Sequence, residues 1–356
     1  MMRHARHESL RAMSLSISWR LSPATGPLAS GATDFADWVQ VAQAAEYAGL
    51  DGLFIPSGAG LPESFTVAAA LCAHTRDLRL TTSFPSDVML PAALAAAAQS
   101  LQSISHNRLH LHLPDSEHSS VRRTFGDLLN RDQRSERIGE YLNILGHLLG
   151  PANGSLDFFG QYFHLENAGY ADCHSRQTVP LLLDESQSTE LIAAHADTCL
   201  LDAQAPQRLA ATIGRLHEAA DRHQRRLGFA TTLGLIMADD ETQAWAAADT
   251  WLSEHRHFVA PPSGFADSSV VQLATATVRR FEIYPNLWRP SALLPVFLVG
   301  SLDQVTSRLV ALQDLGIDHV ILQGAPAVQE ILRVGEELLP RLRARGVTTE
   351  KHSHGQ

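Results

Sequence analysis

The chain has 356 residues, of which 45% are hydrophobic and 19% are charged, and its formal net charge is −10. A chain of this length and composition can bury a large core, and a single (β/α)8 barrel with insertions fits it as well as two domains do. The negative charge argues against a surface for nucleic acid or acidic membranes, and no apolar run approaches membrane-spanning length. The three cysteines have no paired spacing, so we expect a reducing, cytoplasmic environment.

Eight short apolar runs predict buried strands, and a helical pattern follows each of them. The expected strands cover residues 15–21, 53–56, 78–84, 108–113, 179–183, 199–201, 229–237 and 319–322. The expected helices begin at a capping Asp34 and then cover 63–74, 91–104, 133–149, a segment from 188, 206–226, 241–255 and a final segment to 339.

This alternation predicts an α/β fold of the (β/α)8 TIM-barrel type, with the active face at the carboxyl ends of the strands. We expect one domain over residues 14–342, between a flexible N-terminus at 1–13 and a flexible tail at 343–356. Two segments lack the alternation. Residues 150–178 look like a hairpin-type excursion, and the proline-containing residues 258–298 look like an insertion.

Several longer motifs carry a family resemblance. They are GLDGLFIPSG, DFFGQYFHL, SERIGEY, EIYPNLW and GIDHVILQGAP followed by RVGEELLP. With these motifs the chain resembles the bacterial luciferase-like flavin monooxygenase superfamily, and most closely the alkanesulfonate monooxygenases, from residue 14 to 342. The resemblance implies a TIM barrel that takes reduced FMN from a separate flavin reductase, activates dioxygen, oxidises a small organic molecule and pairs as a dimer.

The positions that carry the chemistry in that family are substituted here. The turn after the fifth strand, where the family has glycines and serines around the FMN phosphate, contains Asp184 and Glu185, and two carboxylates would repel a phosphate. The family's other catalytic positions have no titrating side chain in this sequence, and are Leu61, Thr232, Gly234 and Ala325.

A few polar or aromatic candidates remain for the site, and no metal-binding spacing occurs. His112 alternates with His110 along one strand, so both should face the same side, and it is a candidate catalytic group or a hydrogen-bonded core residue. Arg289 is a second catalytic candidate, as a replacement for a lost cationic loop. The cofactor-binding candidates are Ser57, Ser135, Arg137, Ser186 and Gly324, and the substrate-pocket candidates are Trp19, Asn286 and Trp288.

Three functional hypotheses follow. The first is an FMN-dependent monooxygenase with a rebuilt site, which acts on a small apolar or sulfur-containing molecule. The second is a non-catalytic family member that binds no flavin and serves as the partner subunit of an active homologue, in a heterodimer. The third is a deazaflavin-dependent oxidoreductase. Flavin binding by the purified chain would separate the first from the second.

Overall fold

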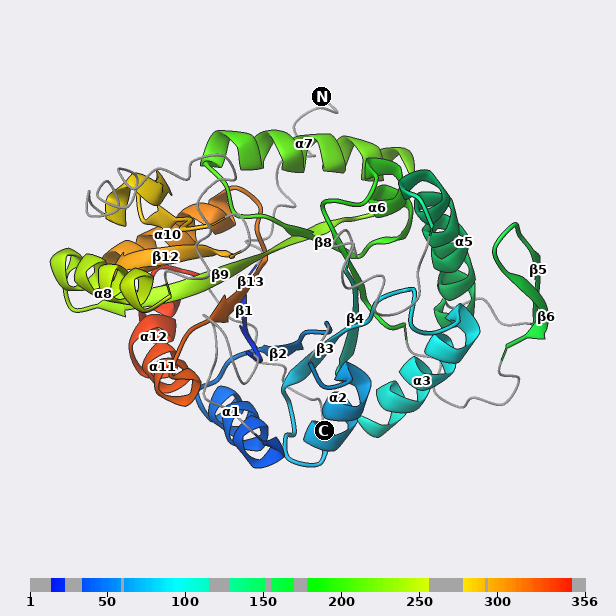
Figure 1. The fold of residues 1–356 in the computed structure, drawn as a ribbon, viewed down its shortest axis with the longest axis horizontal. Helices are drawn as coiled ribbons and strands as arrows, with labels where there is room; N and C mark the ends of the chain where they lie inside the picture. The colour runs from blue at the N-terminus through cyan, green and yellow to red at the C-terminus, as the bar shows by residue number, and fades with distance from the viewer. Residues whose placement is uncertain are drawn as a thin grey trace, which may run out of the picture.

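The computed structural model describes residues 14–22, 34–58, 61–114, 129–150, 155–169, 178–255, 278–291 and 294–347. Eight parallel strands form a closed barrel with helices outside it (Figure 1). In chain order these strands are β1 (Ser16–Arg20), β2 (Gly52–Ile55), β3 (Arg79–Ser83), β4 (Leu109–Leu113), β7 (Leu181–Asp184), β8 (Thr198–Leu201), β9 (Gly228–Ala238) and β13 (His319–Gln323). The predicted TIM barrel is confirmed, and each expected strand lies within two residues of the observed one at both ends.

The barrel closes because β13 pairs with β1 on one side and with β9 on the other, and β9 also pairs with β8. The register places Ser83 beside His112 across β3 and β4. It also places Leu182 beside His112 across β4 and β7. These pairings bring the ends of β3, β4 and β7 together at one edge.

Helices follow the strands and cover the outside of the barrel (Figure 1). The first of them, α1 (Phe35–Tyr47), begins at the predicted Asp34, whose side chain and that of Asp37 each accept a backbone hydrogen bond at the other residue. The others are α2 (Ser64–Cys72), α3 (Pro91–Ile104), α5 (Arg131–Leu149), α6 (Thr189–His195), α7 (Pro206–Arg222), α8 (Glu241–Glu254), α10 (Leu302–Asp314), α11 (Ala327–Arg333), the π-helical turn Val334–Leu338 and α12 (Leu339–Ala344). In the described ranges, none of these helices is both long and apolar enough to cross a membrane.

The predicted excursion near 150–178 contains an antiparallel hairpin, β5 (Leu156–Phe159) and β6 (His164–Ala168), which lies outside α5 (Figure 1). Glu140 of α5 holds the hairpin turn, because its carboxylate accepts backbone N–H groups from Gln161, Tyr162 and Phe163 at 2.6, 2.9 and 3.1 Å. The hairpin is therefore attached to the barrel through α5, since β5 and β6 form a separate sheet that does not pair with the barrel strands.

The described part of the predicted insertion near 258–298 contains regular structure. A 3₁₀ turn (Val278–Phe281), β10 (Glu282–Tyr284) and β11 (Leu287–Trp288) lead into β12 (Val296–Ser301), which joins the main sheet. On one edge of β9, β8 pairs with the first half and β12 pairs with the second half. The apolar run of β12 is buried over five of its six residues, and it extends the sheet beyond the eight barrel strands.

The expected flexible N-terminus at 1–13 lies outside the described residues, as do 256–277 and 292–293 of the insertion and 348–356 of the tail. The first tail residues continue α12 as far as Ala344, and Val347 is buried.

Two layers of side chains fill the molecule. Outward-pointing strand residues such as Trp19, Leu53 and Leu111 pack with the helices in one large apolar cluster. At the amino end of the barrel, polar side chains face each other inside, where His319 Nε2 lies 2.8 Å from Ser18 Oγ and Arg79 donates to Ser16. Burial, with the charges of Arg79 and His110, lowers the pKa of His319 to about 3. These polar contacts occupy the interior at the amino end, and the sites of (β/α)8 barrels lie at the opposite, carboxyl end.

Candidate active site

The carboxyl ends of β2, β3, β4 and β7 bring four polar side chains into one connected row. Ser57 follows β2, Ser83 ends β3, His112 lies in β4 and Asp184 ends β7. Ser57 Oγ lies 3.2 Å from Ser83 Oγ, Ser83 Oγ lies 3.0 Å from His112 Nδ1, and His112 Nε2 lies 2.8 Å from Asp184 Oδ1. We call these four residues the hydroxyl–imidazole chain. It lies where (β/α)8 enzymes carry their chemistry.

An aromatic ring and an arginine pack against the middle of this chain. The Phe54 ring lies 5.1 Å from the His112 ring, and the Arg20 guanidinium lies 5.2 Å from the Phe54 ring. Burial lowers the pKa of Arg20 to about 10, and the negative charge of Asp184 acts against that shift. Arg20 therefore stays cationic at neutral pH and favours an ionised Asp184.

The two carboxylates that the sequence places in the phosphate turn point in different directions. Asp184 is engaged with His112 inside the barrel. The Glu185 carboxyl accepts a backbone hydrogen bond from Asp202, and burial is the main cause that raises its pKa, with the charges of Asp202 and Asp184 adding to it. The raised pKa means that Glu185 keeps its proton to a higher pH than an exposed glutamate does.

Arg289 lies close to the same turn. Its Nη2 donates to both Asp202 carboxylate oxygens at 2.5 Å and to Ala203 O at 3.2 Å. This ion pair ties the segment after β11 to the end of β8. The Arg289 charge is thus used on Asp202 rather than offered to a ligand.

A pocket of about 500 Å³ opens beside the turn, between the ends of β7 and β8 and helix α7. Two arginines of α7, Arg208 and Arg215, line it two helical turns apart, with Thr212 between them. In the described part of the chain neither guanidinium forms an ion pair with another side chain. The full lining is Glu185, Ser186, Gln204, Arg208, Ala211, Thr212 and Arg215.

The donor set of this pocket suits an anion such as a phosphate. Two guanidinium groups, a hydroxyl from Ser186, a hydroxyl from Thr212 and an amide from Gln204 can all donate hydrogen bonds. Glu185 is the one acid in the lining of this pocket. Within the described ranges, by contrast, no group of three or more His, Cys, Asp or Glu side chains is placed to hold a metal ion.

Of the sequence-predicted site residues, the structure brings Ser57 and His112 into the hydroxyl–imidazole chain and Ser186 into the neighbouring pocket. Two others lie on α5. Ser135 is exposed there, while Arg137 donates to Asp87 Oδ1 at 3.0 Å and to Ser86 O at 3.1 Å. Arg137 therefore holds the loop after β3.

The predicted pocket aromatics lie in packed interiors. Trp19 is fully buried in the cluster between barrel and helices, where its ring limits the space beside Gly324. Trp288 is fully buried in a separate cluster with Trp245 and Phe297, and its Nε1 donates to Val278 O at 2.9 Å. The structure does not bring these residues to the hydroxyl–imidazole chain.

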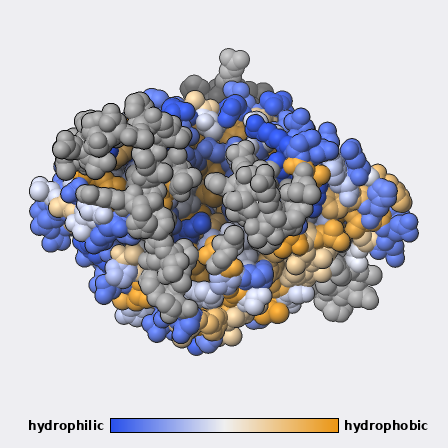
Figure 2. Space-filling view, viewed as in Figure 1, coloured by the Kyte–Doolittle hydropathy of each residue, from blue (hydrophilic) through white to orange (hydrophobic). Residues whose placement is uncertain are grey.

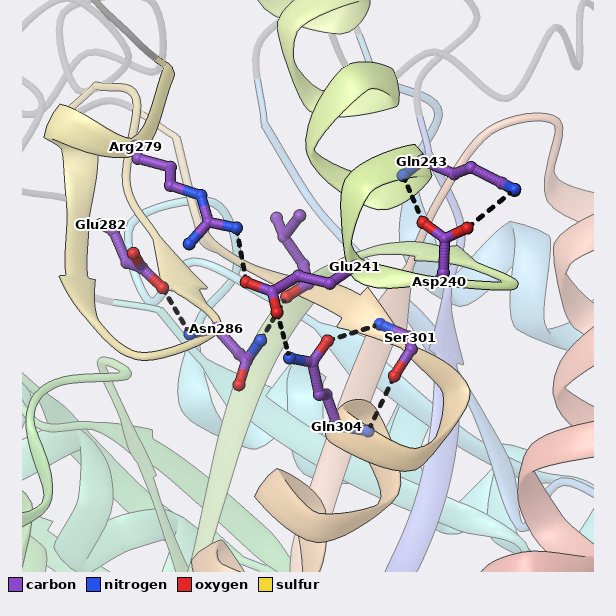
Figure 3. A network of polar contacts seen from close by, with 9 residues as sticks. Asp240, Glu241, Gln243, Arg279, Glu282, Asn286, Ser301 and Gln304 are labelled. Carbon is purple, nitrogen blue, oxygen red and sulfur yellow. Dashed lines mark hydrogen bonds and ion pairs between the residues drawn. The ribbon is translucent and has the colours of Figure 1, made fainter.

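Asn286 belongs to the connection between β10 and β11. Its amide donates to Val299 O at 2.9 Å, and its backbone N–H donates to Glu282 at 2.8 Å. In the same network Glu241 of α8 accepts from Arg279 and from Gln304, which also caps α10 with Ser301 (Figure 3). These contacts fasten the inserted segment to the sheet.

The space beside Gly234 of β9, one of the substituted family positions, is filled by a side chain from another strand. A Cβ atom at Gly234 would lie 2.4 Å from the ring of Phe297, which comes from β12. Thr232 lies two residues earlier and carries no charge. The absence of a histidine here is therefore coupled to aromatic packing.

Sequence reasoning did not single out Ser83, Arg208 and Arg215. Ser83 becomes a neighbour of His112 only through strand register, which the sequence does not contain. The spacing of Arg208, Thr212 and Arg215 predicts that they share one face of a helix. The sequence does not show that this face borders the turn after β7.

Comparison with known proteins adds a family and a set of folds. Residues 13–319 match the family described as luciferase-like monooxygenase. The structure is similar to EDTA monooxygenase (EmoA) from Chelativorans sp. BNC1, with a TM-score of 0.76 and 16% identity over 96% of this chain and 96% of that chain. It is similar to long-chain alkane monooxygenase (LadA), with a TM-score of 0.77 and 15% identity over 96% and 94%. The coenzyme F420 dependent tetrahydromethanopterin reductase from Methanopyrus kandleri gives a TM-score of 0.67 and 15% identity over 92% and 99%. At these identities the structural likeness concerns the fold alone.

Proposed function

Because the chain belongs to the luciferase-like monooxygenase family, we propose that it binds reduced FMN and oxidises a small organic molecule with dioxygen. The observation that carries the proposal is the pocket beside the turn after β7, which Arg208 and Arg215 line together with Glu185 and Ser186, the two residues that follow Asp184 in the sequence. An anion-binding pocket and an acid–base pair then lie on either side of the same short turn.

Arg208, Arg215 and the Ser186 hydroxyl would hold the FMN phosphate. Charge-assisted hydrogen bonds from guanidinium groups to phosphate are stronger than neutral ones, and the two arginines outnumber the single glutamate in the lining of the pocket. This arrangement replaces the glycine-rich and serine-rich turn of the family with side chains from a helix.

Reduced FMN, when bound, supplies the electrons that activate dioxygen. The chain's own residues would manage protons and water. His112 can exchange a proton at Nδ1, where Ser83 lies 3.0 Å away, while Asp184 lies 2.8 Å from its Nε2 and holds the ring in place. The Phe54 ring lies against His112 and the half-buried Arg20 lies against Phe54, so both side chains occupy space next to the hydroxyl–imidazole chain.

The substrate in this proposal is a small apolar or sulfur-containing molecule rather than a sulfonate. Thr232 and Gly234 offer no cation, Phe297 occupies the adjoining space, and Arg289 is engaged by Asp202. A sulfonate would therefore lose its charge-assisted partners on this side of the site.

We also propose that a separate flavin reductase supplies the reduced FMN and that the chain pairs with a second luciferase-like subunit, either its own copy or a homologue. Apolar side chains beside and at the end of α3, namely Val88, Leu90 and Ile104, are exposed. Figure 2 shows apolar surface gathered on the side of the molecule where α3 and α5 lie. Such a surface supports pairing through the helices near the start of the barrel.

The first test is titration of the purified chain with FMN and with riboflavin, which lacks the phosphate. We expect FMN to bind more tightly than riboflavin, and the double variant Arg208→Ala/Arg215→Ala to weaken FMN by about 10-fold or more while riboflavin changes little. Arg222→Ala is the matched control, because Arg222 lies on the same helix but outside the pocket, 3.8 Å from Glu190.

Equal loss of FMN affinity in the control and the double variant would remove the phosphate assignment. No binding of FMN or reduced FMN by the chain alone would reject the stand-alone monooxygenase and favour a partner subunit. Binding of F420 in place of FMN would move the chain to the deazaflavin-dependent class.

A further inference from the structure

The hydroxyl–imidazole chain has two partly exposed ends and a buried middle. Ser83 and His112 are 3% and 5% exposed, whereas the Asp184 side chain is 25% exposed and Ser57 is half-buried. Ser57 is therefore an accessible hydroxyl whose one recorded side-chain partner in the described residues, Ser83, is buried.

With Asp184 ionised and the His112 imidazole neutral, each hydrogen bond in the hydroxyl–imidazole chain has one direction. An ionised carboxylate can only accept, so His112 Nε2, 2.8 Å away, must donate to it. A neutral imidazole has a single N–H, so Nδ1 is then an acceptor. Ser83 lies 3.0 Å from Nδ1 and donates its one hydroxyl proton there.

The consequence appears at the exposed end. Since the Ser83 proton is already directed at His112, the 3.2 Å contact between the two serine oxygens requires Ser57 to donate to Ser83. The Ser57 proton is thereby fixed inward, and only lone pairs of its oxygen face the mouth. The carboxylate charge thus sets the polarity of a hydroxyl three hydrogen bonds away.

We propose that Ser57 is a specificity-determining hydrogen-bond acceptor, held in that state by Ser83, His112 and Asp184, which selects a bound molecule that presents an N–H or O–H donor. A molecule with only a carbonyl or another acceptor at that place meets lone pairs and is disfavoured. This assignment deepens the proposed function, and the choice of flavin as the probe rests on that function. The direction of the hydrogen bonds in the hydroxyl–imidazole chain does not depend on it.

The polarity is measured first, without any ligand. Nuclear magnetic resonance of isotope-labelled histidine ring nitrogens in the full chain reports which nitrogen carries the proton, and His112→Gln identifies the His112 signals by their loss. We expect wild-type His112 to be protonated at Nε2 and the Asp184→Asn variant to lose that preference. A wild-type His112 protonated at Nδ1, whether alone or together with Nε2, would overturn the proposal.

The effect on binding is measured with FMN. Ser83→Ala interrupts the chain between Ser57 and His112 without altering either, so Ser57 becomes free to rotate. We expect FMN affinity to fall by about 3- to 10-fold, which is the range that one neutral hydrogen bond supplies. Ser100→Ala is the control, since Ser100 lies on α3 and bonds only Ala96 O at 2.8 Å among the contacts of its hydroxyl in the described chain.

Unchanged FMN affinity in a folded Ser83→Ala variant, with the expected histidine tautomer present, would overturn the selecting role of Ser57. A chain that binds no FMN but shows protonation of His112 at Nε2 would reject the proposed cofactor and support the polarity. The two failures are therefore distinguishable.

Discussion

The carboxyl end of the barrel has two sides of opposite character. On the side of β2, β3, β4 and β7, small polar residues and a histidine form a connected chain with open ends. On the side of β9 and β12, aromatic rings fill the space, and Phe297 covers Gly234. The first side retains groups that hold and move protons, while the second contributes shape.

The comparison indicates how aromatic packing on one side of the barrel end can coincide with the absence of polar residues there, while a connected polar row lies on the other side. When β12 extends the edge of β9, its side chains pack against α8 and leave no room for a large polar residue at position 234. Polar groups then remain where no extra strand intrudes. The glycine at position 234 of β9 is thus explained by packing against Phe297 as well as being a chemical change.

The largest expected effect concerns the packed side. Trp288→Ala removes a fully buried indole and its hydrogen bond to Val278, so we expect the free energy of unfolding to fall by about 3–5 kcal/mol. FMN affinity, measured where the variant is folded, should stay within about twofold of wild type because the pocket is lined by other residues. A large loss of FMN affinity with little loss of stability would instead place Trp288 in the ligand pocket, as its motif predicts.

A smaller effect is expected at Gly234. Gly234→Ala puts a methyl group where the Phe297 ring lies, so the stability measured by denaturant unfolding should fall by about 1–3 kcal/mol. Gly214→Ala on α7 is the matched control, since nothing lies within 4 Å of its added Cβ, and it should stabilise the helix by about 0.5–1 kcal/mol. If both variants have the same stability change, Phe297 does not occupy the strand-seven position.

The smallest effect concerns Glu185 on the polar side. Burial raises the pKa of this carboxyl, so the folded chain keeps the proton at a pH where the unfolded chain has lost it. As the pH rises above the ordinary glutamate value through the raised one, the wild type should lose stability relative to Glu185→Gln. The newly charged carboxylate should also weaken FMN binding a few-fold relative to the same variant.

The measurement is the ratio of FMN affinities of wild type and Glu185→Gln across pH, which cancels the titration of FMN itself. We expect a ratio near one at acid pH that moves against the wild type as the pH rises. A ratio that does not change with pH would mean that Glu185 does not face the phosphate.

The sequence by itself determined the barrel. Buried apolar runs alternating with amphipathic helices leave a parallel closed sheet as the consistent arrangement, and the strand bounds followed to within two residues. Its motifs also carried the family, and they placed Ser57, His112 and Ser186 at strand ends.

Tertiary structure alone decided which of these residues meet. Strand register places Ser83 beside His112. Asp184 contacts His112, whereas the adjacent Glu185 lines the pocket. The packing of α7 places Arg208 and Arg215 in the same pocket. The sequence predicts Trp19 and Trp288 as aromatics of the substrate pocket, whereas in the structure each lies in a buried apolar cluster. Which side of a strand faces the helices decides this burial. A local pattern fixes which residues alternate along an element, but contacts between elements distant in the chain depend on how those elements pack.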